Sequence, residues 1–144
     1  MPVVYADASA LVKLVRDEAE SQALRSYLDG TDVVSSELVL TEVPRAARRA
    51  AAADPSLPLD LLLRRVGELI DAVALCPLDR ALLAGAGALT EPALRALDAI
   101  HVAAALDLHP VAAFVTYDER QAAVARLAGL RTMAPGTGEG SRPG

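Results

Sequence analysis

The stretch VVYADASALVKLV, residues 3–15, decides the fold class of this chain. Its first four residues are apolar and rich in Val and Tyr, which favours a short buried strand. Asp7 ends this run, and the apolar residues after it recur at helical spacing, with Ser9 as the expected N-cap of the helix. The stretch therefore predicts a strand that passes directly into a helix, with a carboxylate at the junction.

The same strand-to-helix unit recurs along the chain. Further short strands are expected over residues 32–36, 73–78, 112–116 and, at an edge, 130–134. Helical patterns are expected over residues 20–28, 36–54, 57–72, 79–89, 97–108 and in a final segment that ends at Gly129. Pro44 lies inside the third helix, where it removes a backbone hydrogen bond and is expected to kink the helix. Short apolar strands that alternate with helices predict an α/β fold, in which a parallel sheet is covered on both faces.

Composition narrows the function classes. At 144 residues the chain has the size of one ordinary domain. Its net charge of −5 and its 3% of aromatic residues argue against nucleic-acid binding through bulk charge or stacked bases, although a local charge distribution can outweigh the sum. The single cysteine, Cys76, has no partner for an internal disulfide and is interpreted as a core thiol. Because no apolar run reaches the ~18 residues of a membrane span, we expect a soluble cytoplasmic protein.

Four carboxylates are candidates for a shared site at one edge of the predicted sheet. Asp7 follows the first strand, and Asp118 lies two residues after the strand that ends at Thr116. Glu42 lies about a turn and a half into the helix after the second strand. Asp98 lies in the first turn of its helix, where the helix dipole favours negative charge. Because working residues gather beyond the carboxyl ends of parallel strands, these four acids are expected to converge.

Such a gathering of acids predicts a metal site. Two unit charges 4 Å apart repel by about 4 kcal/mol at an effective dielectric of 20, and a divalent cation reverses the sign of that energy. Oxygen ligands suit Mg²⁺ or Mn²⁺ rather than Zn²⁺. A metal of this kind polarises a phosphodiester oxygen and activates bound water, so the acids predict metal-dependent phosphoryl transfer.

Four motifs in order carry a family resemblance: DASALVKL at 7–14, TEVPRA at 41–46, LDAIHVAAA at 97–105 and VTYDER at 115–120. Through these four motifs the chain resembles the PIN-domain ribonucleases, specifically the VapC-type toxins of prokaryotic toxin–antitoxin pairs. The resemblance covers about residues 3–134. The resemblance implies a three-layer α/β/α sandwich with a parallel sheet of about five strands. We expect this PIN domain to occupy residues 1–135 and the Gly-rich residues 136–144 to form a disordered tail.

The resemblance also implies an activity and partners. The expected activity is an Mg²⁺- or Mn²⁺-dependent endoribonuclease, the toxin of a type II pair, which hydrolyses RNA phosphodiester bonds and inhibits translation or growth. The expected partners are RNA, a second copy of the chain and a small DNA-binding, VapB-like antitoxin that occludes the site. The residues carried over as catalytic and metal-binding are Asp7, Glu42, Asp98 and Asp118, with Ser9 and Thr116 as supporting polar groups. Pro44, two residues after Glu42, departs from the family pattern. It affects how far the Glu42 side chain extends toward the other acids.

Each of these acids also has an ordinary structural role available. Asp7 and Asp118 could simply cap helices, and Glu42 could be a solvated charge paired with Arg45 or Arg49. His101 falls on nearly the same helix face as Asp98, and we interpret it as a hydrogen-bonded packing histidine rather than a general base. A zinc site built from His101, Asp107 and His109 is disfavoured, because the spacing matches no standard set.

Five arginines cluster on two successive helices. They form either a solvated basic face or a strip that follows the RNA backbone toward the acids. These residues are Arg45, Arg48, Arg49, Arg64 and Arg65.

Other functions are weaker matches. A haloacid-dehalogenase-like phosphatase needs a second aspartate at the position of Ser9. A receiver-like phospho-acceptor module needs a second acid beside Asp7 and a late lysine, and the second half of the sequence contains no lysine. A catalytically silent PIN-like binding module stays open as an alternative.

Overall fold

The computed structural model describes residues 1–138, which form five strands and seven helices, with one or two helices between successive strands. The strands are β1 (Val3–Ala6), β2 (Asp32–Ser36), β3 (Ala74–Cys76), β4 (Ala113–Val115) and β5 (Thr132–Met133). The helices are α1 (Ala8–Val15), α2 (Ser21–Leu28), α3 (Val39–Ala53), α4 (Leu59–Ala72), α5 (Arg80–Gly87), α6 (Ala96–Asp107) and α7 (Glu119–Leu127).

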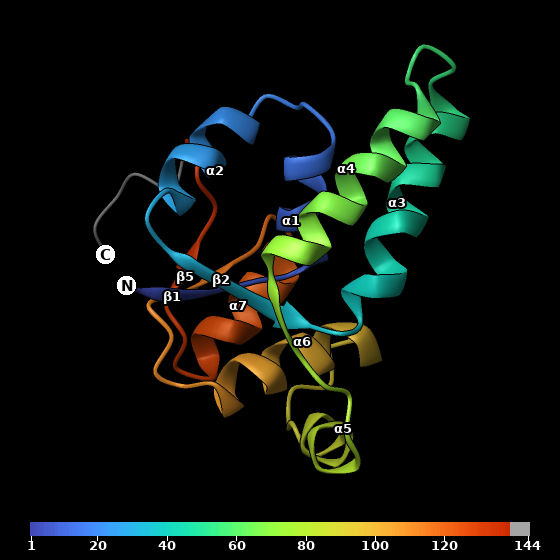
Figure 1. The fold of residues 1–144 in the computed structure, drawn as a ribbon. Helices are drawn as coiled ribbons and strands as arrows, with labels where there is room; N and C mark the ends of the chain where they lie inside the picture. The colour runs from blue at the N-terminus through green and yellow to red at the C-terminus, as the bar shows by residue number, and fades with distance from the viewer. Residues whose placement is uncertain (139–144) are drawn as a thin grey trace.

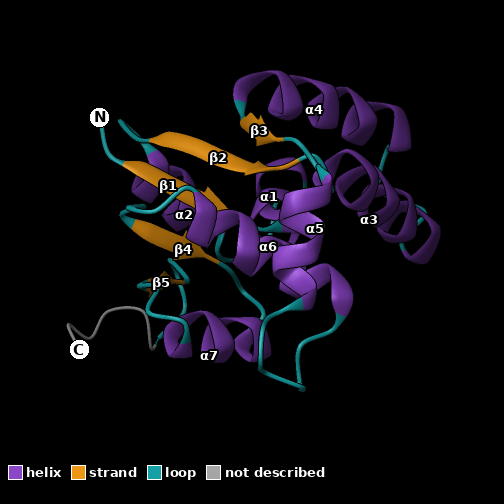
Figure 2. Ribbon diagram, turned by 90° about the horizontal axis from the view of Figure 1, so that it is seen from below, coloured by secondary structure: helices purple, strands orange, loops and turns teal. Residues whose placement is uncertain are grey.

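The five strands form one parallel sheet in the order β3-β2-β1-β4-β5, as Figure 2 shows. Tyr5 on β1 is in register with Val34 on β2 and with Phe114 on β4, so β1 is the central strand. The chain moves outward from β1 to β3 and then crosses back to place β4 on the other side of β1. The carboxyl ends of β1 and β4 therefore flank the point where the strand order reverses, the usual place for ligands in open α/β sheets.

Side chains of the two central strands alternate between two hydrophobic cores. Val4 and Ala6 of β1, with Val115 of β4, pack against helices α1 to α4. Tyr5 and Phe114 face the opposite side and pack against α5, α6 and α7. This period of two places one helical layer on each face, as seen above and below the strands in Figure 1. The expected three-layer α/β/α sandwich with a five-stranded parallel sheet is confirmed.

Two local expectations were wrong. The N-cap of α1 is Asp7, not Ser9, because the Asp7 carboxylate accepts a hydrogen bond from the backbone N–H of Ala10 and Ser9 already lies inside the helix. Helix α3 begins at Val39 rather than near Ser36, because Ser36 still belongs to β2 and a turn precedes the helix. Glu42 therefore lies in the first helical turn, nearer to the sheet edge than expected.

The ends of the described chain bear on two further expectations. Thr137 donates a hydrogen bond to the carbonyl of Ala134, so the structure follows the chain to the start of the expected tail. The rest of that tail, residues 139–144, lies outside the described residues. Within residues 1–138, the helices are too short or too polar to cross a membrane.

The alternating core predicts where leucine substitutions are costly. Leu11 on α1 is 1% exposed and belongs to the core beneath α1–α4, whereas Leu127 at the end of α7 is 73% exposed. We expect Leu11→Ala to lower the free energy of unfolding by about 2–5 kcal/mol, because it removes a buried side chain and leaves a cavity. Leu127→Ala should change it by less than ~0.5 kcal/mol. Urea unfolding followed by circular dichroism measures both values, and equal losses would contradict this assignment of the core.

Candidate active site

Asp7 is the most deeply buried acid at the switch point, with an exposed fraction of 2%. One carboxylate oxygen accepts hydrogen bonds from the Ser9 hydroxyl at 2.6 Å and from the Ala10 N–H at 3.0 Å. The other oxygen accepts a short hydrogen bond from the Thr116 hydroxyl. The pKa of Asp7 is nevertheless raised above its ordinary value, because the loss of water on burial outweighs these hydrogen bonds, which favour the charged form.

Ser9 and Thr116 connect Asp7 to the loop after β4. The Ser9 hydroxyl oxygen accepts from the backbone N–H of Tyr117 at 2.9 Å, and the Thr116 hydroxyl oxygen accepts from the N–H of Asp118 at 3.1 Å. Both hydroxyls thus donate to Asp7 and accept from the backbone of the next loop. These bonds hold the turns after β1 and β4 in one arrangement.

Asp98 and Asp118 lie at the starts of neighbouring helices. Asp118 is the N-cap of α7, where its carboxylate accepts from the N–H groups of Arg120 and Gln121. The Gln121 side chain donates to the backbone carbonyl of Asp98 at 3.2 Å, which ties α7 to the first turn of α6. The pKa of Asp98 is raised first by burial, then by the negative charge of Asp118, with a further contribution from Glu42. The two carboxylates therefore repel each other at this edge of the sheet.

Glu42 reaches the same edge from α3 and is held there by His101. Its carboxylate oxygen Oε1 lies 2.6 Å from Nε2 of His101, and Nδ1 of the same ring lies 2.7 Å from the hydroxyl of Tyr5. His101 is buried and hydrogen-bonded through both nitrogens, as expected for a packing histidine. Glu42 is therefore not a freely solvated charge, and no pairing with Arg45 or Arg49 occurs within the described part of the chain.

The structure brings the predicted acids to one edge but does not close them around a single point. Among residues 1–138, no three side chains of His, Cys, Asp or Glu lie close enough together to hold a metal ion as they stand. Asp7 is bonded to its two hydroxyl neighbours, and Glu42 is bonded to His101. The donors are nevertheless all carboxylate oxygens, and burial together with the negative charges of Asp118 and Glu42 raises the pKa of Asp98. Both properties suit a hard divalent cation such as Mg²⁺ or Mn²⁺.

A groove of about 520 Å³ runs beside these acids between α1 and α3. Ser9 and Glu42 line it, together with Arg45 and Arg49 from the predicted basic strip. Arg65 instead donates to the backbone carbonyl of Val15 at the end of α1. The five arginines are thus divided, and only Arg45 and Arg49 share the groove with Glu42. Sequence reasoning missed Lys13 and Tyr117, which also line the groove, although Lys13 follows Ser9 by one helical turn and so had a spacing signal.

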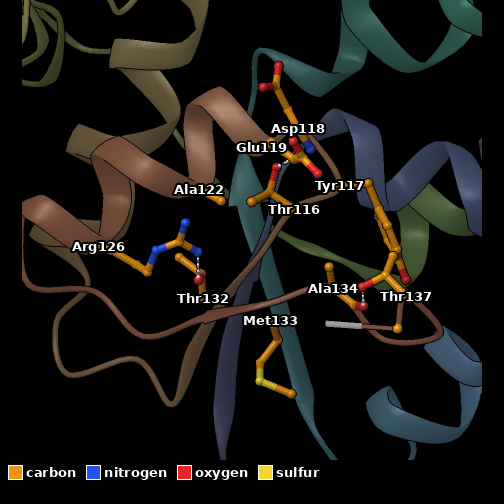
Figure 3. A pocket seen from close by; sticks show the side chains of 11 residues that line it. Thr116, Tyr117, Asp118, Glu119, Ala122, Arg126, Thr132, Met133, Ala134 and Thr137 are labelled. Atoms are coloured by element: carbon orange, nitrogen blue, oxygen red, sulfur yellow. Dashed lines mark hydrogen bonds between the residues drawn. The ribbon is translucent and has the colours of Figure 1, made fainter. Parts of the chain in front are cut away.

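A second hollow, of about 630 Å³, lies at the carboxyl ends of β4 and β5 (Figure 3). Thr116 and Asp118 line its upper part in this view, and Arg126 donates to the Thr132 hydroxyl at 2.9 Å across one wall. Asp118 therefore lines this hollow, whereas Glu42 lines the groove between α1 and α3.

The repulsion at Asp98 predicts a measurable gain when its charge is removed. An acid whose pKa is raised on folding stabilises the fold most below its ordinary pKa, and this contribution is lost as the pH rises through the raised value. In EDTA at neutral pH, Asp98→Asn should raise the melting temperature by about 1–3 °C, since less than ~1 kcal/mol is available to a half-exposed group. The gain should shrink toward pH 4.

The matched control for this prediction is Asp60→Asn. Asp60 is an exposed acid in the first turn of α4, where the helix dipole favours its charge, so its replacement should not raise the melting temperature. Differential scanning fluorimetry across this pH range measures both variants. A lower melting temperature for Asp98→Asn at neutral pH would contradict the crowding of negative charge.

Comparison with known proteins assigns this chain to a family. A family model described as PIN domain matches residues 4–127, a range that contains all four predicted acids. Ribonuclease VapC35 of Mycobacterium tuberculosis (strain CDC 1551 / Oshkosh) is 39% identical over 141 residues, which cover 93% of this chain and 98% of the relative. Ribonuclease VapC47 of the same strain is 34% identical, with coverage of 93% and 98%. Ribonuclease VapC46 of M. tuberculosis (strain ATCC 25618 / H37Rv) is 38% identical, with coverage of 94% and 99%. The chain belongs to the PIN-domain family.

Proposed function

We propose that this chain is a divalent-metal-dependent endoribonuclease and the toxin of a type II toxin–antitoxin pair. One observation carries the proposal: buried Asp7 and the mutually repelling Asp98 and Asp118 lie along the same edge of a PIN-family sheet, at its switch point. The names of its relatives, which are ribonucleases of the VapC group, support the same activity.

In this proposal the buried carboxylate of Asp7 supplies a fixed negative charge. Its three hydrogen bonds come from the turns after β1 and β4, so the carboxylate cannot rotate without breaking them. Preorganised charge of this kind needs no rearrangement during the reaction. Ser9 and Thr116 act as supporting groups because they orient this charge.

We propose that Asp7, Asp98 and Asp118, with Glu42, hold Mg²⁺ or Mn²⁺. A bound ion of this type would polarise the scissile phosphodiester and lower the pKa of an attacking water molecule. The residues themselves provide the negative charge that attracts a cation, since Asp98 already experiences the charges of Asp118 and Glu42.

The groove between α1 and α3 offers a path for RNA toward the acids. Arg45 and Arg49 are one helical turn apart on α3, and both are exposed on a groove that also contains Glu42. Their guanidinium groups can neutralise backbone phosphates, which a chain with a net charge of −5 would otherwise repel.

The proposal extends to partners and location. A small DNA-binding antitoxin of the VapB type would occlude the site, and a second copy of the chain would form a homodimer, as the resemblance to VapC-type toxins implies. A translation-inhibiting toxin that cuts RNA would act in the cytoplasm. A catalytically silent binding module of the same family is the alternative, and the activity assay below separates the two.

The purified protein should cut a structured RNA in Mg²⁺ or Mn²⁺, and EDTA should stop the cleavage. Asp7→Asn and Asp98→Asn should each reduce the rate by more than about 100-fold, because even the loss of an outer partner of a metal ligand commonly costs about 10–100-fold. Asp60→Asn, the exposed control on α4, should cut at the wild-type rate. Gel analysis of end-labelled RNA measures all four proteins.

Two results would contradict this proposal. Cleavage that persists at full rate in Asp7→Asn and Asp98→Asn would show that the acids do not form the site. An intact, folded wild type that binds RNA but never cuts it in either metal would favour the silent module.

The groove arginines give a separate prediction about binding. In the Asp7→Asn background, the double variant Arg45→Ala, Arg49→Ala should weaken RNA binding and reduce the slope of log K against log salt by about 1.4, since each lost contact to single-stranded phosphate contributes ~0.7. Arg48 and Arg64 are equally exposed but do not line the groove, so their double Ala variant is the control. Fluorescence anisotropy at several salt concentrations measures both slopes. If the two double variants show the same slope of log K against log salt, the groove is not the path of RNA.

A further inference from the structure

We infer that His101, anchored by Tyr5, is a positioning residue that holds the carboxylate of Glu42 in one orientation at the acidic edge. The catalytic consequence of this inference rests on the proposed function. The hydrogen-bonded arrangement itself does not depend on that function and can be tested without RNA or metal.

Three elements contribute one residue each to this arrangement. Tyr5 comes from the central strand β1, is fully buried, and stacks on Phe114 with ring centroids 5.3 Å apart and planes at 7°. Its hydroxyl lies 2.7 Å from Nδ1 of His101 on α6, and Nε2 of His101 lies 2.6 Å from Oε1 of Glu42 on α3. The sheet is thus connected to the Glu42 carboxylate by two short hydrogen bonds in series.

The chemistry of the three groups fixes the direction of both bonds. An ionised carboxylate can only accept, so Nε2 of His101 must carry the proton that it donates to Glu42. In the neutral ring, Nδ1 is then an acceptor, and the Tyr5 hydroxyl donates to it. Burial raises the pKa of Tyr5 above its ordinary value, so this hydroxyl keeps its proton. In a neutral ring the Tyr5 hydroxyl therefore favours the tautomer that can donate to Glu42.

The surroundings of the three groups show why a fixed orientation matters here. His101 is 2% exposed and the Glu42 side chain 21% exposed, so the bond joins a buried ring to a carboxylate on the groove wall. Oε1 is occupied by His101, while Asp98 experiences the negative charge of Glu42. A free glutamate on a helix surface would extend into water and lose rotamer freedom when it bound a ligand. The bond from His101 removes that freedom beforehand.

A space-filling role alone does not account for this arrangement. An apolar side chain at position 101 could fill the core between α6 and the sheet without burying two ring nitrogens, each of which needs a partner. Both nitrogens have one, and one of the partners is a predicted site residue.

The first test records the side-chain nitrogen spectrum of ¹⁵N-histidine-labelled protein without RNA or metal. His101 should show the neutral tautomer protonated at Nε2, with a downfield proton that exchanges slowly with water. Glu42→Ala should move that proton upfield or abolish its signal, and Tyr5→Phe should shift the Nδ1 resonance. Exposed His109, two residues beyond the end of α6, is the internal reference and should not change. A ring protonated at Nδ1 alone, or a Nε2 proton unaffected by Glu42→Ala, would overturn the inference.

The second test measures RNA cleavage in a cycle of His101→Leu, Glu42→Ala and the double variant. His101→Leu should reduce kcat by about 10–100-fold, the usual loss when an outer partner of a site residue is removed. In the Glu42→Ala background the same change should cost less than about twofold, because its effect passes through Glu42. His101→Gln, whose amide can still donate to Glu42, should retain most of the activity.

The control for this cycle is Val102→Ala. Val102 is as deeply buried on α6 as His101, so its truncation should lower the melting temperature but leave kcat unchanged at a temperature where the variant is folded. If His101→Leu does not fold, Tyr5→Phe replaces it in both Glu42 backgrounds, because it removes the hydroxyl that anchors His101. If the substitution of His101 lowers kcat equally in the wild-type and Glu42→Ala backgrounds, His101 has only a structural role. A wild type that never cuts RNA would overturn the proposed function, and the nitrogen spectrum distinguishes that outcome from failure of the positioning role.

Discussion

A buried carboxylate at the end of the central strand is the constraint on which the rest of this site depends. Asp7 is removed from water at the carboxyl end of β1, where an unpartnered charge would be strongly unfavourable. Ser9, Thr116 and the N–H of Ala10 supply the missing hydrogen bonds. These groups also shape the two turns. The N–H of Ala10 belongs to the first turn of α1, and the hydroxyls of Ser9 and Thr116 accept hydrogen bonds from the loop after β4. The hydrogen bonds to Asp7 and the fold of the two central turns therefore support each other, although burial still raises the pKa of Asp7.

The sheet order gives this carboxylate its neighbours. Because β4 pairs with β1, the turns after these two strands are adjacent. The helices that follow them, α1 and α7, therefore start at the same edge of the sheet. Asp118 caps α7, and Gln121 one turn later fixes the start of α6 and with it Asp98. The acids consequently come from four different helix starts. Repulsion between Asp98 and Asp118 is tolerated because packing and backbone hydrogen bonds elsewhere hold these helices in place.

Positive charge is arranged differently from negative charge. The acids occupy the turns at the sheet edge, whereas Arg45 and Arg49 lie on the outer side of α3 and reach the groove beside them. A chain with a net charge of −5 can thus present a local basic surface next to an acidic centre. Glu42 stands between the two regions, and its bond to His101 keeps it with the acids rather than with Arg45 and Arg49, which follow one and two turns later in α3.

The sequence by itself determined the layered fold and the acids at its edge. Period-two strands, helical spacing and the positions of Asp7 directly after β1 and of Asp118 three residues after β4 are local patterns. The sequence misplaced the cap of α1 and the start of α3, since both depend on which hydrogen bonds the neighbouring turn offers. It also could not show that His101 joins Tyr5 to Glu42. These three residues are separated by 96 and 59 positions, and only the packing of α3 and α6 against the sheet makes them neighbours. Tertiary structure alone decided which side-chain groups are held in place and which two arginines face the groove, because those contacts join distant segments through directional bonds that no local spacing encodes.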